Sequence, residues 1–449
     1  MPGNYFSFVC QLLLICCHFT PFYCSINREI FTSNSRLLLN EYQGKNDHLE
    51  SYDRVRSYLP GTAGGGATRG SGSEENIFRA VWNVPNYCEE RAGVKLPLSD
   101  YGIEFNDDGG WDSGKVISLL GDKLGYYPYV NSVDGRFING GLPQLGNITA
   151  HLEKVADDIQ SMIPDPDYNG FCVIDWESWY PQWDSIERRY RTYSIEHVRR
   201  LHPTWDNLTV DTVAELEWTQ GAKLFFESTL KLGKAMRPKA LWGFYHYPYC
   251  NVIPNTTTCN PPGPERNDEI MWFFNETTCL YPSIYLISKY SGSYAPSVRG
   301  RLAEAIRVRD LSSDPKGPIM SYTRFNYTDT HYFFTLEDLN NTILTSAEFG
   351  TNGVIFWGDN YDSKVGSCQE LRQYIIDALG PTVVLAREGA TACSKRVCSG
   401  QGRCVGDILT CSKGDDRQNG KRSQNKGSVC TCRCFVGWQG YDCSTKAKY

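Results

Sequence analysis

Residues 171–183 read FCVIDWESWYPQW, and this stretch decides the fold. The apolar run that ends at Asp175 predicts a buried strand, and Glu177 follows two residues later among tryptophan and tyrosine. Side chains two residues apart in a strand point to the same face, so we expect both carboxylates to face one site. In parallel barrels, active sites lie at the carboxyl ends of the strands. A lone D-x-E at a strand end more often caps a helix or meets solvent, so the rest of the chain must decide.

Strand-like and helix-like segments alternate on both sides of this stretch. Helices are predicted over 148–163, where apolar residues share one helical face, and over 211–236. The predicted strands lie within 77–88, 124–130, 170–175, 240–248, 280–286, 317–323 and 352–358. Repeated βα units across about three hundred residues predict an α/β fold built on a parallel barrel.

The two carboxylates suggest a reaction. Adjacent carboxyls in an apolar, aromatic setting have pKa values that are pushed apart, so one stays ionised while the other keeps its proton. Glycosidic cleavage needs such an acid together with a negative group. Ordinary retaining glycosidases hold their carboxyls about 5 Å apart on separate elements. A pair on one strand fits substrate assistance better: the sugar's N-acetyl oxygen attacks, Asp175 orients the amide, and Glu177 acts as acid and then base.

Composition limits the class of protein. The chain has 449 residues and a net charge of −6, with 41% hydrophobic and 13% aromatic residues. This content suffices for a large core, and the acidic balance argues against a nucleic-acid partner. The many tyrosines and tryptophans suit a sugar cleft, because sugar rings stack on aromatic faces, although most such rings belong to protein cores.

Cysteines and sequons indicate a secretory protein. The apolar stretch FSFVCQLLLICCHF within residues 1–24 predicts a signal peptide, and its removal leaves fourteen of the eighteen cysteines. We expect no membrane anchor, because the sequence near the C-terminus contains no apolar run that would indicate one. We therefore expect a secreted or lysosomal protein. Six predicted glycosylation sites are Asn147, Asn207, Asn255, Asn275, Asn326 and Asn340.

Three further segments follow the signal peptide. Residues 25–74 are Gly/Ser-rich and read as a flexible segment, and 75–388 carry the barrel pattern. Residues 389–449 are dense in cysteine and glycine, with EGF-like spacing interrupted by a basic insert over 412–427. A module with so little apolar content needs disulfides or a bound metal ion for stability. Zinc is the competing interpretation, but this spacing in a secreted chain favours disulfides, so we expect no metal.

The motifs VWNVPNYC, LGYYPYV, GGLPQ, VIDWESWYPQW, LWGFYHYPYC, LYPSIYL and GVIFWG occur in this order. Together they resemble the hyaluronidase family of bee venom, mammalian sperm and lysosomes, over about residues 76–446. The resemblance implies a distorted (β/α) TIM-like barrel of about seven strands with a C-terminal EGF-like module. It also implies a cofactor-free endo-β-N-acetylhexosaminidase whose partner is a glycosaminoglycan, hyaluronan and in some members chondroitin.

The resemblance also implies roles for single residues. Glu177 corresponds to the proton donor and Asp175 to its N-acetyl-orienting partner. Tyr245 and Tyr281 match cleft tyrosines that position the acetamido group, and Trp357 matches the ring under the reacting sugar. Each aromatic residue, taken singly, is more often a core residue.

Two positions depart from the family pattern. Tyr180 stands where the family has an arginine that binds a uronate carboxylate, and tyrosine cannot form the charged bidentate contact. Leu120 stands where the family has a tyrosine. Arg301 and Glu304 match a family stretch; Arg301 either supplies positive charge to the cleft or lies on a solvated helix face. We therefore expect an altered cleft on at least one side.

By the same resemblance, the expected disulfides are Cys88–Cys368, Cys250–Cys259, Cys393–Cys404, Cys398–Cys432 and Cys434–Cys443. Cys411 and Cys430 flank the insert and can pair with each other. Cys172 and Cys279 lie outside the family pattern, and they form either an extra bridge or two buried thiols.

Three hypotheses follow. The chain is an active hyaluronidase-like hydrolase, a weakly active or inactive glycosaminoglycan-binding protein on the same scaffold, or a hydrolase that prefers chondroitin. The intact carboxylates and cleft aromatics favour activity, because a decayed enzyme is expected to lose some of them. Size analysis of hyaluronan and chondroitin digests discriminates the three.

Overall fold

The computed structural model describes residues 77–106, 109–121, 123–251, 253, 255–288, 292, 295–330, 332–358, 367–413 and 430–447. The expected signal peptide (1–24), the Gly/Ser-rich segment (25–74) and nearly all of the basic insert lie outside these residues. The described residues all belong to one unit, Gly61–Tyr449.

Two four-stranded sheets form the centre of this unit, in the orders β2-β1-β10-β9 and β3-β4-β7-β8. Every pairing within them is parallel except β3 with β4. The strands are β1 (Arg79–Asn83), β2 (Glu104–Phe105), β3 (Asp112–Ser113), β4 (Val116–Leu120), β7 (Phe171–Asp175), β8 (Leu241–Phe244), β9 (Met320–Thr323) and β10 (Gly353–Trp357).

A short extended segment at residues 280–283 joins the two sheets into a barrel. Parallel bridges link Tyr245 to Tyr281 on one side, and Leu280 to Ile319 and Ser283 to Tyr322 on the other. The resulting order is β1, β10, β9, segment 280–283, β8, β7 and β4, which confirms the expected barrel of about seven strands.

One asparagine spans the distorted seam between β2 and β4. The side-chain oxygen Oδ1 of Asn106 accepts hydrogen bonds from the backbone N–H groups of Lys115 (2.7 Å) and Val116 (3.0 Å). Its amide nitrogen donates to the carbonyls of Val116 (2.9 Å) and Gly110 (2.8 Å). Buried backbone groups must be paired. This single side chain therefore satisfies groups that a ladder partner would satisfy in a regular barrel.

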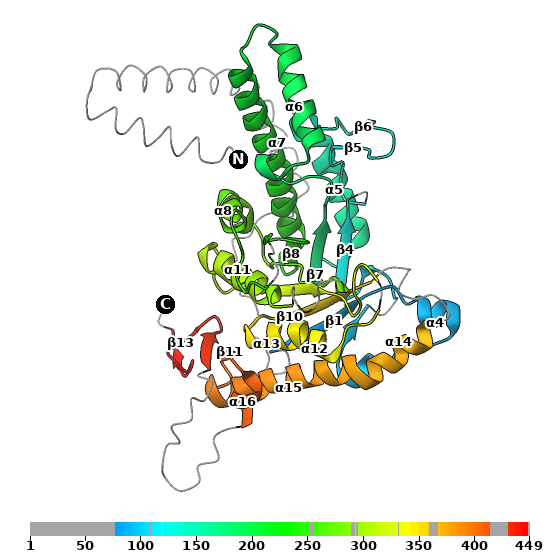
Figure 1. Ribbon diagram of the computed structural model, residues 1–449, viewed down its shortest axis with the longest axis vertical. Coiled ribbons are helices and arrows are strands. Elements are labelled where there is room, and N and C mark those ends of the chain that lie inside the picture. The colour runs from blue at the N-terminus through cyan, green and yellow to red at the C-terminus, as the bar shows by residue number, and fades with distance from the viewer. Residues whose placement is uncertain are drawn as a thin grey trace, which may run out of the picture. The chain divides into compact units, whose positions relative to one another are not determined.

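Helices cover both sides of the barrel (Figure 1). The longer ones are α5 (Ile148–Met162), α6 (Arg188–Leu201), α7 (Asn207–Met236), α11 (Ser297–Leu311) and α15 (Gly380–Val397). The predicted helix at 148–163 is confirmed, and its apolar stripe from Ile148 to Ile163 is buried. Among the described residues, no helix has the length and apolar character needed to span a membrane.

Shorter elements complete the chain. They are α4 (Tyr87–Ala92), η3 (Ser99–Tyr101), β5 (Tyr129–Val130), β6 (Phe137–Ile138), η4 (Pro143–Leu145), η5 (Trp183–Ser185), α8 (Gly263–Glu269), α9 (Met271–Phe274), α12 (Leu336–Leu339), η7 (Asn340–Leu344), α13 (Thr345–Glu348), α14 (Cys368–Tyr374) and η8 (Ile375–Leu379). The tail adds β11 (Gly402–Val405), α16 (Ile408–Lys413), β12 (Thr431–Cys434), β13 (Trp438–Gln439) and β14 (Thr445–Lys446).

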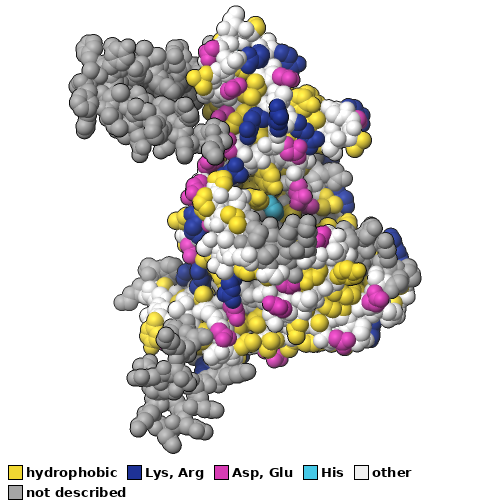
Figure 2. Space-filling model, viewed as in Figure 1, with side chains coloured by type: hydrophobic (Ala, Val, Ile, Leu, Met, Phe, Trp, Pro, Cys, Tyr) yellow, Lys and Arg dark blue, Asp and Glu magenta, His cyan; other side chains and the backbone are white. Residues whose placement is uncertain are grey.

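Positive charge gathers on one helix although the net charge is −6. Helix α6 alone carries Arg188, Arg189, Arg191, Arg199 and Arg200. Figure 2 shows Lys and Arg side chains grouped over the part of the molecule where α6 and α7 lie. The charge of the chain is therefore unevenly distributed over its surface.

The predicted strand at 124–130 is wrong. Only its last two residues, β5, are extended, and they pair with β6 in a small antiparallel ribbon. The backbone N–H of Gly125 donates to Asp158 (2.8 Å), and that of Tyr126 donates to the ring of His151 (2.9 Å). Side chains of α5 thus take the donors that a strand neighbour would take, and β4 supplies the barrel strand instead.

The tail packs onto the barrel. Helix α15 runs from the barrel into the tail, and the expected boundary between 388 and 389 lies inside it (Figure 1). The buried sulfurs of Cys393, Cys398, Cys404 and Cys443 belong to the same core cluster as β1 and β10. The tail therefore shares the core of the barrel.

All five expected disulfides are present, and Cys411 pairs with Cys430. Because the cysteines of the tail are in disulfides, none of them is a thiolate that could bind zinc. Cys172 and Cys279 are not joined to each other and are buried thiols. Burial raises the pKa of the Cys172 thiol, which makes it unreactive.

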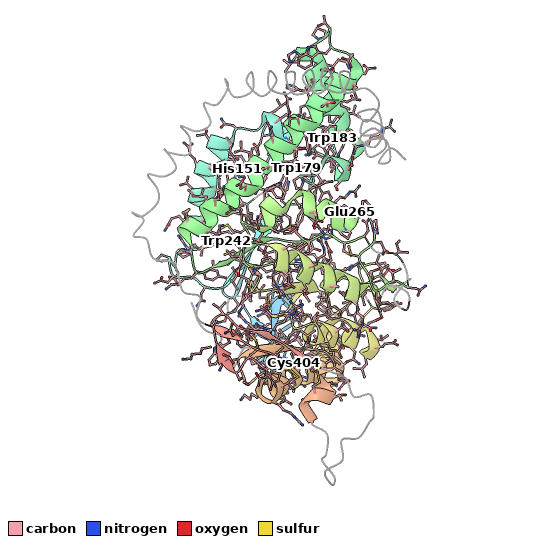
Figure 3. All side chains as sticks on the ribbon, turned by 90° about the vertical axis from the view of Figure 1, so that its left-hand side faces the viewer. His151, Trp179, Trp183, Trp242, Glu265 and Cys404 are labelled. Carbon is pink, nitrogen blue, oxygen red and sulfur yellow. A yellow bond between two sulfur atoms is a disulfide. The ribbon has the colours of Figure 1, made fainter. Side chains whose placement is uncertain are left out.

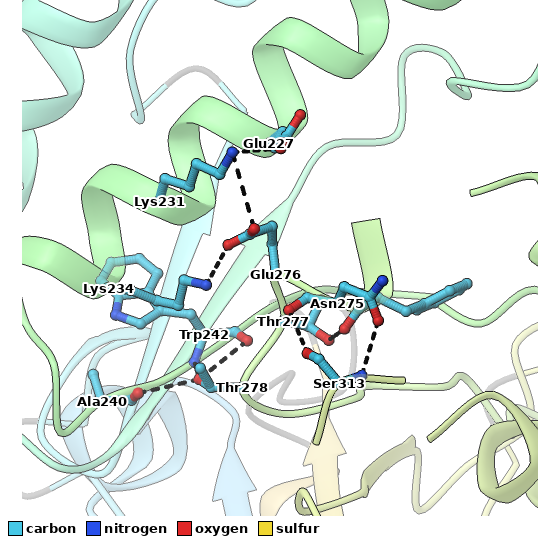
Figure 4. A network of polar contacts seen from close by, with 11 residues as sticks. Glu227, Lys231, Lys234, Ala240, Trp242, Asn275, Glu276, Thr277, Thr278 and Ser313 are labelled. Carbon is cyan, nitrogen blue, oxygen red and sulfur yellow. Dashed lines mark hydrogen bonds and ion pairs between the residues drawn. The ribbon is translucent and has the colours of Figure 1, made fainter. Parts of the chain in front are cut away.

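A polar network fixes the amino-terminal end of the barrel strands (Figure 4). Lys231 and Lys234 of α7 pair with Glu276. Thr278 accepts a hydrogen bond from the backbone N–H of Trp242 (2.6 Å) and donates to the carbonyl of Ala240 (3.2 Å). These contacts hold the chain just before segment 280–283, so they position a barrel strand from the end opposite to the carboxylates.

Candidate active site

The two carboxylates lie where the parallel strands end. Asp175 is the last residue of β7 and is in register with Leu120 at the end of β4. Trp357 ends β10 and is in register with Asn83 at the end of β1. The carboxyl ends of the strands therefore meet at one edge of the barrel, as expected for a parallel barrel site.

A cavity of about 250 Å³ opens at this edge. Its lining includes Asp175, Glu177, Tyr245, Tyr285, Tyr322 and Trp357. The structure thus brings four predicted site residues together, Asp175, Glu177, Tyr245 and Trp357, and adds two tyrosines. Leu120 also lines the cavity, and it is in register with Asp175 on the neighbouring strand.

The two carboxyls differ in their surroundings. The Oδ1 atom of Asp175 is buried and has no hydrogen-bond partner among the residues that the structure describes. Burial, and then the nearby charge of Glu177, raise the pKa of Asp175 to about 7. Burial also raises the pKa of Glu177, whose side chain is more open to the cleft. The pair can therefore retain a proton up to nearly neutral pH.

Hydroxyl and amide groups form the floor beside Asp175. The amide of Asn83 donates to Ser118 Oγ (2.7 Å) and to the hydroxyl of Tyr322 (3.3 Å). Asn83 and Ser118 are both buried. Sequence reasoning missed this group; the available signal was that Asn83 ends β1 as Asp175 ends β7.

Two aromatic side chains line the same cavity as the carboxylates: Tyr245, directly after β8, and Trp357, at the end of β10. The hydroxyl of Tyr245 donates to Ser283 Oγ (3.3 Å), and burial raises its pKa to about 12, so it stays a neutral donor. The guanidinium of Arg324, itself buried, lies 4.9 Å from the centre of the Trp357 ring. This contact fixes the ring that we expected under the reacting sugar.

Tyr281 does not line the cleft. Its side chain is fully buried in the barrel interior, and its hydroxyl donates to the carbonyl of Leu241 (2.6 Å), near the start of β8. Tyr285, four residues later, lines the cavity instead. The motif LYPSIYL contains both tyrosines, and only the later one lies beyond the strand segment 280–283, where a site residue is expected.

A second cavity of about 510 Å³ continues from Glu177, Tyr245 and Tyr285. Tyr180 lines it, with its ring centre 6.2 Å from that of Tyr249. Arg301 lines it too, and its guanidinium donates to the carbonyls of Ser283 (3.2 Å) and Tyr285 (3.0 Å).

Of the two alternatives for Arg301, the structure favours the cleft. Its guanidinium is the one lysine or arginine head among the described residues that line the two cavities. Glu304, in contrast, is buried behind the helix and accepts hydrogen bonds from Asn267 (2.7 Å) and Arg307 (2.8 Å). Glu304 is therefore structural.

The tryptophan between the two carboxylates is held from behind. Trp176 stacks on Tyr127, with ring centres 4.6 Å apart. The hydroxyl of Tyr127 donates to Thr229 Oγ1 (3.1 Å), which also lies 2.9 Å from His151 Nε2. Burial lowers the pKa of His151 to about 3, so this ring is neutral. Because His151 Nδ1 accepts from the backbone of Tyr126, its proton lies on Nε2.

Trp179 adds a second anchor for this stretch. Its indole N–H donates to the carbonyl of Pro128 (2.6 Å), and its ring packs edge-on against Trp218 of α7. Figure 3 shows His151 and Trp179 close together beside this helix. The residues around the carboxylates are thus fixed by packing rather than by solvent-exposed loops.

The predicted glycosylation sites differ in exposure. Four of the asparagines are exposed, namely Asn147, Asn207, Asn255 and Asn275. Asn340 is half-buried. Asn326 is 1% exposed and accepts a hydrogen bond from Arg324 Nε (3.0 Å). The prediction at Asn326 is wrong for the folded chain, because a buried amide cannot carry a glycan.

Comparison with known proteins gives a consistent result. The sequence model of the hyaluronidase family matches residues 68–414. Rat hyaluronidase-1 is 33% identical over 409 residues, covering 84% of this chain and 91% of the relative. Human hyaluronidase-1 is 33% identical over 83% of this chain and 93% of its own length, and pig hyaluronidase-3 is 33% identical over 82% and 90%.

Solved structures agree with the sequence comparisons. Bee venom hyaluronidase is 34% identical and superposes with a TM-score of 0.63, covering 68% of this chain and 99% of that one. Its complex with a hyaluronic acid tetramer gives a TM-score of 0.63 at 33% identity, covering 68% and 98%. The chain belongs to the hyaluronidase family, because the family model, the sequence identity to its members and the shared barrel all agree.

Proposed function

We propose that this chain is a secreted or lysosomal endo-β-N-acetylhexosaminidase that hydrolyses the β-1,4 linkages of hyaluronan by a substrate-assisted, retaining route. One observation carries the proposal: Asp175 and Glu177 leave the same strand end and share one aromatic-lined cavity. The bound hyaluronic acid tetramer in the bee venom relative supports the choice of polymer. The disulfides support an oxidising compartment.

Each carboxyl has one task in this mechanism. In the reactive form of the pair Glu177 holds the proton, a state that burial favours by raising its pKa, and donates it to the glycosidic oxygen as the bond to the leaving sugar breaks. The acetamido oxygen of the substrate attacks the anomeric carbon and forms a cyclic oxazolinium ion. Glu177, now a carboxylate, takes a proton from water, and that water opens the ring with retention of configuration.

Asp175 acts on the acetamido group. Its buried Oδ1 atom is an acceptor with no partner among the described residues, which suits an incoming amide N–H. Because the pair shares one proton, Asp175 is ionised in the form in which Glu177 carries that proton. As the oxazolinium forms, positive charge develops beside this carboxylate, which stabilises it. Tyr245 is a neutral hydroxyl at the same wall, and by turning its O–H from Ser283 Oγ toward the cleft it can donate to the acetamido oxygen instead.

Product analysis tests this function. Wild-type protein is incubated with hyaluronan and, separately, with chondroitin across a pH series, and digests are sized. We expect even-numbered oligosaccharides of hyaluronan with N-acetylhexosamine at the reducing end, and the β anomer first in an NMR time course. If the α anomer forms first, the substrate-assisted route is excluded.

The same digests address the competing functions. Binding of hyaluronan without any shortening of the polymer would favour a glycosaminoglycan-binding protein on this scaffold. Faster cleavage of chondroitin would favour the chondroitin-preferring hydrolase. The second cavity, with a neutral Tyr180 and a single arginine, is the feature that makes polymer preference worth measuring.

A further inference from the structure

His246 adopts a backbone conformation that glycine favours. It is the residue after Tyr245, and its φ angle is +79°. A non-glycine residue in this region is uncommon, and such residues cluster at functional sites, where the surrounding structure holds them in place. Its backbone N–H donates to the carbonyl of Tyr281 (3.0 Å), which ties the strained position to segment 280–283.

The imidazole of His246 faces the second cavity. Its ring centre lies 5.2 Å from that of Tyr249 and 6.4 Å from that of Tyr180. Neither ring nitrogen makes a hydrogen bond to any other residue that the structure describes. Burial, and then the charge of Arg301, lower the pKa of His246 to about 4. Above that pH the ring offers one donor and one acceptor to whatever enters the cavity.

Glu177 divides the cleft into two sides. It lines both cavities, whereas Asp175 lines only the first. In the proposed mechanism the sugar with the reacting acetamido group lies over Asp175, and Glu177 protonates the oxygen that joins it to the next sugar. The second cavity is therefore on the side of the leaving sugar, which in hyaluronan is a glucuronate.

We propose that His246 is a specificity-determining residue that binds a hydroxyl of the leaving uronate in the second cavity. Arg301 supplies the charge for the carboxylate, and the rings of Tyr180 and Tyr249 flank the sugar. The inference rests on the proposed function, because it needs the reacting sugar to lie over Asp175. It explains why a side chain stands at a backbone position where glycine would be relaxed.

Two substitutions and two substrates test the proposal. His246→Gly removes the ring and suits the positive φ, and His246→Asn keeps a donor and an acceptor and tolerates that φ. His202→Asn, at the half-buried C-cap of α6 and outside the lining of both cavities, is the matched control. The substrates are hyaluronan and a hyaluronan oligosaccharide whose reducing-end N-acetylglucosamine carries nitrophenol, so that the leaving side holds no sugar.

We expect His246→Gly to lower kcat/KM on hyaluronan about tenfold more than on the nitrophenyl substrate, as for one lost hydrogen bond. The ratio of transfer to hydrolysis with a glucuronate-terminated acceptor should fall as well, because acceptors bind on the leaving side. His246→Asn should recover part of both losses. Thermal melts of each variant check that the fold is retained.

Equal losses on both substrates, or no loss on hyaluronan, would overturn the proposal. A wild-type protein that leaves hyaluronan intact would instead refute the proposed function, so the two failures are distinguishable. If His246→Gly does not fold, His246→Asn measured against His202→Asn still decides, since a ring with a purely structural role gives no substrate-dependent difference.

Discussion

The raised pKa of Asp175 predicts that the folded protein loses stability as the pH rises from about 4 to about 7. In the folded chain this pKa is about 7, against 3.8 for an ordinary aspartate. A carboxyl whose pKa is higher when folded binds its proton more tightly in the native state. Its contribution to stability is therefore complete below pH 3.8, declines as the pH rises toward 7, and is gone above that value.

The size of this effect follows from the shift. A difference of about three pKa units, at 1.36 kcal/mol per unit, gives ~4 kcal/mol. The carboxyl is only half-buried and lines an open cleft, so solvent screens part of this energy and we expect ~2–4 kcal/mol. Asp175→Asn keeps the shape of the protonated acid and removes the ionisation. The variant should match wild type near pH 4 and become more stable than wild type as the pH rises.

Chemical denaturation at pH 4, 5.5, 7 and 8 measures this directly. The free energy of unfolding of Asp175→Asn minus that of wild type should grow between pH 4 and 7 and then level off. The variant should also lose nearly all activity, because an amide cannot stabilise the developing oxazolinium charge. A difference in unfolding free energy that stays constant across the pH series would refute the reasoning, since the pKa of Asp175 would then be the same in the folded and the unfolded chain.

Two further predictions concern the cleft and its support. Tyr180→Arg should lower KM on hyaluronan several-fold with a smaller change in kcat, because a charge-assisted contact helps ground state and transition state alike; Arg301→Ala should raise KM. Unchanged KM in the first variant with a large rise in the second would mean that Arg301 already binds the carboxylate. Tyr127→Phe removes the hydrogen bond to Thr229 and should cost about 1 kcal/mol of unfolding free energy. The exposed Tyr441→Phe is its control, and an equal effect of both would contradict the role of the network behind Trp176.

Much of the fold was readable from local patterns. The helix at 148–163 has apolar residues along one helical face, and the strand before Asp175 is a short continuous apolar run, so local patterns located both. The stretch 124–130 failed because its backbone donors are taken by Asp158 and His151, a tertiary effect that no local pattern contains. β4 has the same buried pattern as β7, and it was missed because residues 124–130 were predicted as the strand in its place.

Site residues at the end of a strand could be predicted from the sequence, whereas the sequence does not show which side chains are buried in the barrel and which reach the cavity. Asp175 and Glu177 follow from strand geometry, but LYPSIYL offers two tyrosines, and the pattern does not say which one clears the barrel interior. The structure answers through the hydrogen bond of Tyr281 to Leu241. His246 carries no signal in its residue type, because its strain is a property of the backbone.

The central claim is that Glu177 is the acid that cleaves a glycosaminoglycan chain. Glu177→Gln keeps the shape of the side chain and removes the proton it donates. At the pH optimum of the wild type, the account predicts a loss of turnover on hyaluronan of at least ~100-fold with an unchanged thermal melt. Wild-type turnover in this variant would contradict the account.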